Sequence, residues 1–322
     1  MESIKFWSKQ LEAAIQDLDW PEGPNNLYDP LRYFMTIGGK RMRPMLALMS
    51  NKMFGGNGNE AMPSALCVEL FHNFTLIHDD IMDEAPVRRS KTTVHKKWND
   101  NIAILSGDVL MIYAYNQLLN QRPEHLPDLL RLYNTTAIEV CEGQQMDMDF
   151  ETRNDVEIEE YIEMIRLKTS VLLGCALKMG AIVANASEED ADKIYHFGQE
   201  LGLAFQIKDD LLDLYGDPEK FGKQIGGDVI ANKKTLLYLM ALKTATPEQL
   251  TRFQTLEKES DLEKKVEDVK KLFSDLKVPE KAQEHMDKHY KNAMSAIDSI
   301  ALSDESKQEL KELAHYLMHR DQ

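Results

Sequence analysis

Apolar positions recur along the chain with the spacing of helices. In the middle of the sequence they return every three or four positions, as on one face of a helix. They include Ile162, Ile165, Leu172, Leu173 and Leu177. A strand-like alternation of apolar and polar residues between turn residues is missing. The pattern therefore predicts an all-α protein.

Proline placement agrees with long helices. No proline lies between Pro127 and Pro218, and a proline inside a helix costs about 3 kcal/mol. Short polar breaks separate the predicted helices, and Ser187 followed by acidic residues indicates a helix start. The breaks are residues 55–59, 122–124, 186–189 and 222–232. None is long enough to be a domain linker, so we expect a single domain over residues 1–322.

Charge and cysteine content narrow the class of protein. The 322 residues include 54 acidic residues and 38 lysines and arginines, for a formal net charge of −16. A general nucleic-acid binder would carry a basic stripe, so nucleic acid is not an expected partner. An anionic ligand would need local basic clusters or bound cations. Three scattered cysteines, Cys67, Cys141 and Cys175, indicate a reducing compartment and no disulfide framework or zinc site.

The sequence predicts neither a signal peptide nor a membrane-spanning helix. The first residues carry charges where a signal peptide needs an apolar core. The longest apolar stretch, Leu172 to Ala184, is interrupted by Lys178 and is too short to span a bilayer. We therefore expect a cytoplasmic protein without membrane insertion.

One short pattern, Asp-Asp-x-x-Asp, occurs twice. It is found at Asp79-Asp80-Ile81-Met82-Asp83 and at Asp209-Asp210-Leu211-Leu212-Asp213. On a helix, residues four apart share a face, so each pattern stacks two carboxylates one turn apart. Like charges at this spacing destabilise a helix, although apolar neighbours predict that both patterns lie inside packed helices. Oxygen ligands in this arrangement suit Mg²⁺, which joins one or two carboxylates to substrate phosphates.

Basic residues gather near these two aspartate motifs. The segment Gly38-Gly39-Lys40-Arg41-Met42-Arg43-Pro44 places three cations after a glycine turn. Arg88 and Arg89 follow the first motif, and Lys223, Lys233 and Lys234 follow the second. Such forks and point charges bind diphosphates. His72 lies two helical turns before Asp79, a position that favours a ligand contact over simple packing.

With these motifs in this order, the chain resembles the trans-isoprenyl diphosphate synthases, also called the polyprenyl synthetase family, and among them the geranylgeranyl and farnesyl diphosphate synthases. The resemblance covers nearly the whole chain. It rests on Gly39 to Pro44, His72 with the first aspartate motif, Arg88-Arg89 with His95, Gly143-Gln144, Lys168-Thr169, Phe205-Gln206 with the second motif, and Gly222-Lys223 to Lys233. It implies an all-α, isoprenoid synthase-type helical bundle around a deep central cavity, and a homodimer.

The resemblance also implies a role for each matching residue. Asp79, Asp83 and Asp209 would bind Mg²⁺, with three ions once substrate is bound. Asp80, Asp210 and Asp213 would order those carboxylates or their waters. The allylic diphosphate would be held by Arg88, Lys168, Thr169, Gln206, Lys223 and Lys233. Isopentenyl diphosphate would be held by Lys40, Arg43, His72 and Arg89.

The implied reaction joins isopentenyl diphosphate to dimethylallyl, geranyl or farnesyl diphosphate by ionisation, condensation and elimination. Cations would stabilise the charge that grows on the departing diphosphate. The sequence offers no dedicated base, and in the family the departing diphosphate is thought to take the proton. Water must be excluded from the allylic cation, and residues 216–232 are a candidate flexible lid.

Several positions depart from the family pattern. After Arg88-Arg89 the family usually has a glycine and later a proline, where this chain has Ser90 and Thr92. The glycine that commonly precedes the late lysine is Asn232, which also tolerates unusual backbone angles. The C-terminal residues are less basic than in many relatives, which puts a C-terminal contact to diphosphate in doubt.

Aromatic residues before the first motif predict the product length. Phe74 lies five residues before Asp79, about 7.5 Å along a helix, and Phe71 lies a further turn away. A single large residue at this place, with Thr75 beside it, resembles the floor of geranylgeranyl-type synthases. We expect a product of twenty carbons, with fifteen as the next choice.

Two other functions remain open. A class I terpene cyclase shares the first metal motif and the fold, but it would normally carry a different second motif. A non-catalytic regulatory subunit of a prenyl synthase tends to lose an aspartate motif or its basic partners. Both aspartate motifs and their basic neighbours are present here, which favours the synthase.

Overall fold

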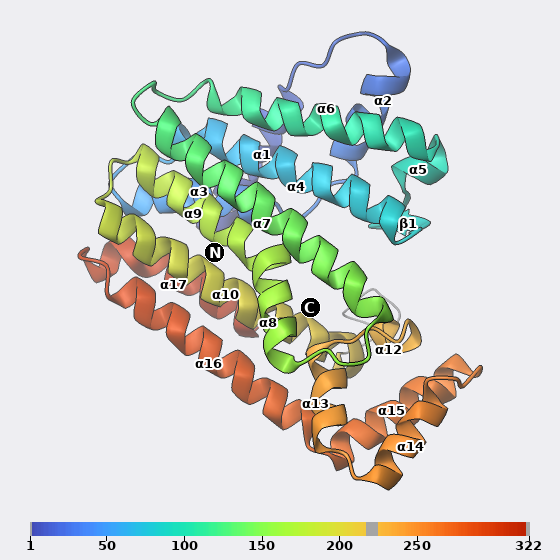
Figure 1. Ribbon diagram of the computed structural model, residues 1–322. Coiled ribbons are helices and arrows are strands. Elements are labelled where there is room, and N and C mark those ends of the chain that lie inside the picture. Colours follow the sequence, from blue (N-terminus) through green and yellow to red (C-terminus); the bar gives the residue numbers. More distant parts are fainter. Residues whose placement is uncertain (1, 217–224, 320–322) are drawn as a thin grey trace. The chain divides into compact units, whose positions relative to one another are not determined.

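The computed structural model describes residues 2–216 and 225–319, which fold almost entirely as helices (Figure 1). The α-helices are α1 (Glu2–Gln16), α2 (Asn25–Thr36), α3 (Met42–Met53), α4 (Met62–Met82), α5 (Val94–Lys97), α6 (Asp100–Leu118), α7 (Leu126–Thr152), α8 (Ile158–Ile165), α9 (Val171–Val183), α10 (Glu188–Tyr215), α12 (Gly227–Ile230), α13 (Leu236–Thr244), α14 (Pro247–Leu256), α15 (Leu262–Asp275), α16 (Val278–Asp298) and α17 (Asp304–His319). A 3₁₀ turn, η1 (Asn59–Ala61), precedes α4, and a π-helical segment, η2 (Arg166–Ser170), joins α8 to α9. The prediction of an all-α protein is confirmed.

The residue contacts divide the chain into two compact units. Unit 1 comprises residues 1–134, 175–194 and 301–310, and unit 2 comprises residues 135–174, 195–300 and 311–322. Helices α7, α9, α10 and α17 contribute residues to both units. The assignment of residues 1–322 to one synthase domain stays a prediction.

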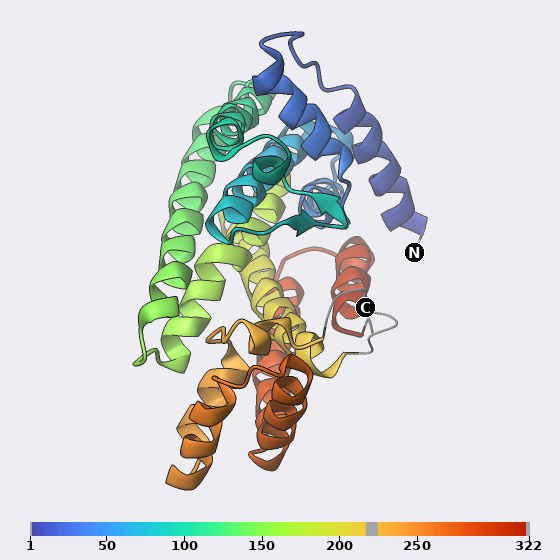
Figure 2. The same cartoon turned by 90° about the vertical axis from the view of Figure 1, so that its right-hand side faces the viewer.

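Unit 1 is built around α4, most of whose side chains are buried. Pro63 in its first turn suits a helix start, because proline lacks an amide hydrogen that would need a partner there. A short antiparallel hairpin, β1 (Val87–Arg88) with β2 (Lys91–Thr92), follows α4. The hydroxyl of Tyr33 on α2 donates to the carbonyl of Thr92 at 2.7 Å, and Figure 2 shows this hairpin beside α2.

Unit 2 brings α7 into close contact with the π-helical segment. A Cβ atom on Gly143 of α7 would lie 2.3 Å from the backbone nitrogen of Lys168. Only glycine permits this approach, so the backbones of α7 and η2 touch directly. Single π turns inside helices often mark functional sites, and the helical periodicity of the sequence gave no indication of this one.

Three of the four predicted breaks, 55–59, 122–124 and 186–189, separate consecutive α-helices. The side-chain oxygen of Ser187 accepts a hydrogen bond from the amide of Asp190 at 3.1 Å, as expected for the residue before α10. The break predicted at 222–232 is wrong in part, because α12 lies within it. Residues 217–224 fall outside the described part of the chain. Among the described helices, none combines the length and the apolar character needed to cross a membrane.

Candidate active site

Both aspartate motifs lie at the C-terminal ends of their helices. α4 ends at Met82, so Asp83 follows the helix, and its amide donates to the carbonyl of Asp79 at 2.8 Å. The second motif occupies the last turns of α10, which ends at Tyr215. The prediction that the motifs lie inside helices is confirmed for the second motif, whereas the first runs one residue past the end of α4. The C-terminal end of a helix carries partial negative charge, so carboxylates at these places need cations even more.

The two motifs share one pattern of burial. The middle carboxylates are buried, since Asp80 is 1% exposed and Asp210 is 4% exposed. The outer residues are partly or fully accessible, and these are Asp79, Asp83, Asp209 and Asp213. Each motif thus presents two accessible carboxylates around a buried third, in separate units of the structure.

In unit 1 the buried carboxylate holds an arginine. Nε of Arg88 donates to Oδ1 of Asp80 at 2.8 Å, and Nη2 of the same guanidinium lies 2.8 Å from that oxygen. Burial raises the pKa of Asp80, and the adjacent Arg88 counteracts part of that rise. Asp80 therefore orients Arg88, a contact that the sequence did not predict; its role in ordering the metal-binding carboxylates or their waters stays a prediction.

In unit 2 the buried carboxylate is held by neutral donors. The hydroxyl of Tyr161 donates to Oδ2 of Asp210 at 2.6 Å, and the amide of Gln206 donates to Oδ1 at 3.2 Å. Burial is the main reason that the pKa of Asp210 rises to about 7, and the negative charge of Asp228 adds to the rise. Gln206 thus acts on the motif itself, in addition to any contact it makes with substrate.

Asp213 organises the short helix after the second motif. Its Oδ2 accepts a hydrogen bond from the amide of Asp228 at 3.1 Å, and its carbonyl accepts one from the amide of Gly226 at 2.7 Å. The flexible lid expected over residues 216–232 stays a prediction, and residues 217–224 of it lie outside the described part of the chain. Residues 226–232 begin at these two hydrogen bonds. They form a bonded turn that leads into Lys233, whose side chain is exposed.

The remaining lysines of unit 2 differ in role. Lys168 lies on η2, and its Nζ is 2.5 Å from Oδ2 of Asp147. Thr169, next to it, is partly accessible. Lys234 donates to the carbonyl of Phe150 at 2.6 Å near the end of α7, so it ties down a helix terminus and its grouping with the diphosphate-binding lysines is wrong. The predicted Lys223 lies outside the described residues.

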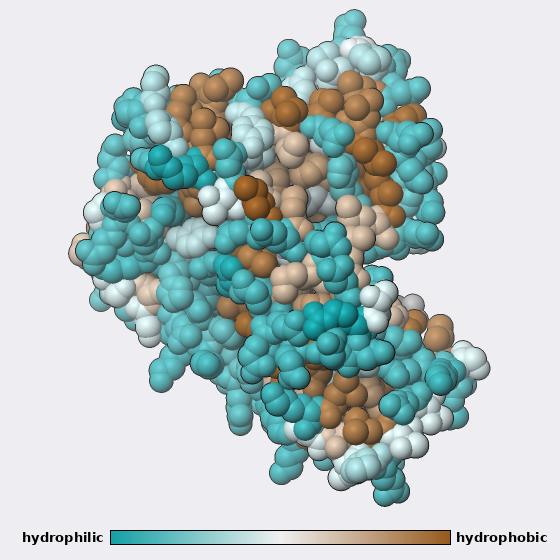
Figure 3. Space-filling model, in the orientation of Figure 1, coloured by the Kyte–Doolittle hydropathy of each residue, from teal (hydrophilic) through white to brown (hydrophobic). Residues whose placement is uncertain are grey.

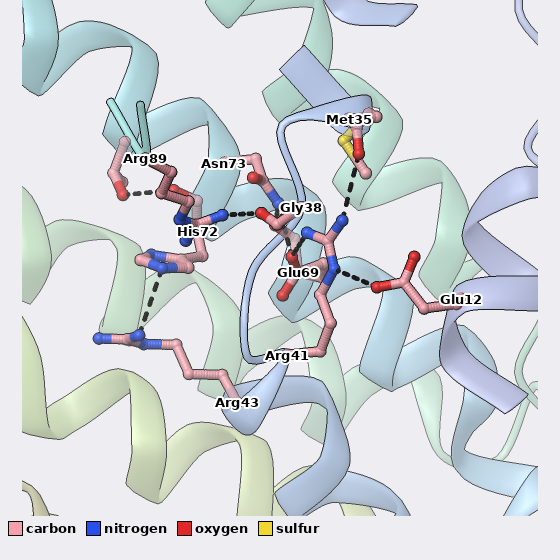
Figure 4. Close-up of polar contacts among 10 residues, drawn as sticks. Glu12, Met35, Gly38, Arg41, Arg43, Glu69, His72, Asn73 and Arg89 are labelled. Carbon is pink, nitrogen blue, oxygen red and sulfur yellow. Dashed lines mark hydrogen bonds and ion pairs between the residues drawn. The ribbon is translucent and has the colours of Figure 1, made fainter. Parts of the chain in front are cut away.

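A second basic group forms in unit 1, around His72 of α4 (Figure 4). Nη1 of Arg43 lies 3.3 Å from Nε2 of His72, and Arg89 donates to the carbonyl of Gly38. Desolvation and the guanidinium groups of Arg43 and Arg89 lower the pKa of His72 well below 6.5. His72 is therefore neutral at physiological pH, beside groups that suit an anion. Lys40 is exposed on the same loop.

Gly39 and Arg41 shape that loop. Gly39 has φ +155°, and a Cβ there would lie 2.5 Å from Nη1 of Arg89, so the guanidinium packs on the glycine. Arg41 is 4% exposed and pairs with Glu69 and, at 3.0 Å, with Glu12. Figure 4 shows this pairing next to His72. Arg41 thus holds the loop in place, and its inclusion among the diphosphate-binding cations is wrong.

The aromatic residues before the first motif pack in a row. The ring centroids of Phe71 and Phe74 are 5.6 Å apart, and those of Phe71 and Tyr133 are 5.4 Å apart. Tyr133 in turn lies 4.6 Å from the ring of Tyr115. Phe71 is 1% exposed and Phe74 is 9% exposed. Tyr133 comes from α7, so the sequence near the motif gave no sign of its part in this row.

Several other residues of the site escaped the sequence analysis. They are Asp147, Tyr161 and Asp228, which contact or influence Lys168 or Asp210. Asp147 lies three residues after Gln144 on α7. Its position close to the Gly143-Gln144 pair was the one sequence signal that could have identified it as a site residue. Tyr161 looked like an ordinary core aromatic.

The carboxylates of the two motifs suit Mg²⁺ that is bound by the protein and the substrate together. Within residues 2–216 and 225–319, no group of three or more His, Cys, Asp or Glu side chains is arranged to hold a metal ion. Mg²⁺ keeps several waters and typically takes only one or two carboxylates together with substrate phosphates. The accessible outer carboxylates of each motif, Asp79 with Asp83 and Asp209 with Asp213, match that requirement.

Comparison with known proteins gives a consistent result. The family model for polyprenyl synthetases matches residues 24–276. The chain is 41% identical to a geranylgeranyl diphosphate synthase of Methanosarcina mazei, over 76% of each chain. It is 34% identical to a short chain isoprenyl diphosphate synthase of Methanothermobacter thermautotrophicus, over 100% of this chain and 98% of the relative. A crystal structure of a geranylgeranyl pyrophosphate synthase superposes with a TM-score of 0.94 at 42% identity and covers 98% of both chains.

Proposed function

The chain belongs to the polyprenyl synthetase family and is a trans-prenyltransferase, and from that premise we propose that it makes a short-chain all-trans prenyl diphosphate from isopentenyl diphosphate and an allylic diphosphate. The observation that carries this proposal is the repeated aspartate motif. Each copy has two accessible carboxylates and a buried middle carboxylate with its own hydrogen-bond donors. Such repetition suits a reaction in which Mg²⁺ binds a diphosphate.

In this proposal Asp79, Asp83 and Asp209 bind Mg²⁺. The metal supplies positive charge that offsets the charge growing on the departing diphosphate. Arg88, Lys168, Lys223 and Lys233 bind the allylic diphosphate with Thr169 and Gln206. The Arg88 guanidinium is already oriented by Asp80, which reduces the entropy lost on binding.

Isopentenyl diphosphate binds the basic group around His72. Arg43, Arg89 and Lys40 supply positive charge, and neutral His72 offers a ring nitrogen to its neighbours. Guanidinium groups match the geometry of phosphate oxygens. The packing of Arg89 on Gly39 and the buried pairing of Arg41 keep this group in one shape before substrate arrives.

The chemistry proceeds in three steps. The allylic C–O bond breaks, and its electron pair leaves with the diphosphate. The double bond of isopentenyl diphosphate then attacks the allylic cation and forms the new C–C bond. The resulting tertiary cation loses a proton to the departed diphosphate, so no protein base is required. Fixed cations act mainly on the transition state, where the charge on the diphosphate is growing.

The product is geranylgeranyl diphosphate, with farnesyl diphosphate as the next choice. Phe74 and Phe71 form the floor beneath the growing chain, and Tyr133 supports Phe71 from behind at 5.4 Å between ring centroids. Closely packed aromatic rings resist displacement, so the floor stops elongation at a defined length. The relatives named above as geranylgeranyl synthases support this choice.

The alternative functions receive less support. A terpene cyclase has no use for the basic group of Arg43, His72 and Arg89. A regulatory subunit has no need of buried carboxylates that orient Arg88 and Gln206 beside both motifs. The cytoplasmic location stays a prediction.

The chain forms a homodimer through α6. This helix is apolar on nearly all sides, and it has large exposed side chains: Ile104, Leu105 and Ile112 are 43–56% exposed. Hydrophobic residues gather over α6 in the space-filling view (Figure 3). A helix that is apolar all round is normally covered, and a second copy supplies the cover. Leu105→Glu should shift the mass measured by light scattering from dimer to monomer, whereas Phe6→Glu, at an equally exposed position of α1, should leave it unchanged.

An elongation assay tests the proposed function. Purified protein with Mg²⁺ and isopentenyl diphosphate receives dimethylallyl, geranyl or farnesyl diphosphate in parallel, and mass spectrometry resolves the products. We expect every primer to be extended, ending at twenty carbons, and chelation of Mg²⁺ to stop the reaction. Diphosphate binding without elongation from any primer would contradict the synthase and favour a cyclase or a regulatory subunit.

Substitutions in the floor test the product length. Phe74→Ala, alone or with Phe71→Ala, should lengthen the product because the ring that stops the chain is gone. Tyr133→Phe keeps the ring and loses only the hydroxyl, so its product should match that of the wild type. An unchanged product distribution in the Phe74 and Phe71 variants would show that the floor lies elsewhere.

A further inference from the structure

The short helix α12 connects the second aspartate motif to Lys233, and its residues are only partly buried. None of the four α12 residues is fully buried. A cavity lies along this segment, lined by Asp228, Asn232, Lys233, Tyr238 and Lys265 among others. Polar contacts hold α12 at both of its ends. At its N-terminal end these contacts come from Asp213, which binds the amides of Gly226 and Asp228.

The C-terminal end of α12 is held by a buried lysine of α15. Lys265 is 3% exposed. Its Nζ donates to the side-chain oxygen of Asn232 at 2.7 Å, to the carbonyl of Glu257 at 3.2 Å and to the carbonyl of Ile230 at 3.3 Å. An ammonium group has three N–H donors, so these three contacts use all of them. A lysine is rarely buried unless such partners compensate for the lost water.

Asn232 links the Lys265 side chain to the backbone next to Lys233. It adopts φ +52°, a left-handed conformation that few residues other than glycine and asparagine accept. Its side chain accepts from Lys265 and donates to the carbonyl of Glu257 at 3.3 Å. The next amide, that of Lys233, donates to the carbonyl of Asp228 at 2.9 Å. The direction in which the chain leaves α12 is thereby fixed just before the Lys233 side chain.

We propose that Lys265 is a positioning residue for the reaction, acting through Asn232 to set where Lys233 presents its ammonium group to the allylic diphosphate. The inference rests on the proposed function, in which Lys233 binds that substrate. A purely structural lysine would join α12, α14 and α15 with no effect on one substrate in particular. A positioning lysine affects the allylic diphosphate and spares isopentenyl diphosphate, whose proposed ligands lie in unit 1.

Lys265→Met tests this proposal against a matched control, Lys264→Met. Methionine keeps the length of the side chain and removes its three donors. Lys264 is the neighbouring lysine of α15, and it is exposed and paired with Glu259 at 2.9 Å. We expect Lys265→Met to raise the KM for the allylic primer about tenfold and to leave the KM for isopentenyl diphosphate within about twofold of the wild type. Lys264→Met should change neither.

Asn232→Gly supplies a second variant that keeps the fold. Glycine accepts the left-handed backbone but lacks the oxygen that Lys265 binds. Its KM for the primer should rise in the same direction, by less than in Lys265→Met, and the double variant should show less than the sum of the two effects on a free-energy scale. Equal rises in both KM values, or additive effects in the double variant, would overturn the proposal.

Hydrogen exchange gives a readout that does not depend on activity. Amides of residues 227–236 should exchange faster in Lys265→Met and in Asn232→Gly than in the wild type or in Lys264→Met. The reason is that hydrogen bonds from Lys265 to the end of α12 are lost. Unchanged exchange in both variants would overturn the proposal that Lys265 holds α12, even if the wild type elongates prenyl chains. A wild type that fails to elongate would instead overturn the proposed function, and the exchange result would still decide whether Lys265 holds α12.

Discussion

The two aspartate motifs are alike in sequence but are supported by different chemistry. In unit 1 the buried Asp80 faces a cation, Arg88, at 2.8 Å. In unit 2 the buried Asp210 faces two neutral donors, Tyr161 at 2.6 Å and Gln206 at 3.2 Å. Burial raises the pKa of both carboxyls; Arg88 opposes the rise at Asp80, whereas the pKa of Asp210 rises to about 7. Motifs of the same pattern therefore place their middle carboxylates in different electrostatic surroundings.

This difference indicates a division of labour. The first motif has an oriented guanidinium beside its buried carboxylate, and the basic group of Arg43 and Arg89 lies in the same unit. The second motif gains its full charge when cations are bound, and it also holds the N-terminal end of α12 through Asp213. We expect the first motif to be preformed and the second to depend more on bound metal.

Removing an outer carboxylate should have the largest effect. Asp79→Ala and Asp209→Ala should each lower turnover about a thousandfold, because each removes a proposed metal ligand at the charge that develops in the transition state. Turnover of isopentenyl diphosphate with geranyl diphosphate measures this, with thermal unfolding as a check on the fold. Asp287→Ala, at an exposed position of α16, is the matched control. Near-normal rates in both motif variants would remove the metal assignment.

Replacing the middle carboxylates should separate the two motifs. Asp80→Asn leaves Arg88 beside a neutral group, so turnover should fall about a hundredfold and the free energy of unfolding by about 2 kcal/mol. Asp210→Asn preserves the shape beside Tyr161 and Gln206, and its turnover should fall by less than about tenfold. Turnover rates and thermal unfolding curves of the two variants measure this difference. Equal losses in the two variants would contradict the unequal support described above.

The arginine-rich surroundings of His72 should appear as a pH dependence of stability. Its pKa lies well below 6.5 in the folded protein, so the unfolded chain binds a proton at a higher pH than the folded one. Stability should therefore fall as the pH drops below about 6.5, by up to about 1.4 kcal/mol per pH unit. His72→Gln should flatten the dependence of the urea-unfolding free energy on pH in this window. Parallel curves for wild type and His72→Gln would argue against a neutral His72.

The smallest effect is expected at a carboxylate of unit 2 outside the motif. Burial raises the pKa of Glu200, but hydrogen bonds from His289 at 2.8 Å and Asn292 at 3.1 Å outweigh it, and the pKa is lowered from 4.5. This contribution is present above pH 4.5 and is lost as the pH falls through the lowered pKa. Glu200→Gln should cost about 1 kcal/mol at neutral pH and progressively less in acid, measured by urea unfolding. A constant difference at all pH values would contradict the assignment.

The sequence predicted the parts of the site whose signal is local. Helical periodicity, the proline-free run and the Ser187 helix start predicted the fold correctly, and the spacing within each motif identified the carboxylates. The basic segment before α3 was found because it stands out in an acidic chain. These features depend on residues within a few positions of one another.

Contacts between distant residues could not be predicted in this way. Tyr161 and Asp210 are 49 positions apart, and Asp147 and Lys168 are 21 apart, so neither pair leaves a periodic trace. Arg41 and Arg43 look alike in the sequence, and only the burial of Glu69 separates a structural arginine from a candidate ligand. The π-helical segment depends on the approach of Gly143, which is also a tertiary contact.

The central claim is that each aspartate motif contributes to Mg²⁺-dependent binding of the allylic diphosphate. Calorimetric titration with an unreactive thio analogue of geranyl diphosphate tests it directly, in the wild type, Asp79→Ala and Asp209→Ala, with and without Mg²⁺. If both motifs bind Mg²⁺, the wild type should bind the analogue tightly only with Mg²⁺, and each variant should lose at least about tenfold in affinity. Equal affinity in all three proteins, or binding that is indifferent to Mg²⁺, would contradict it.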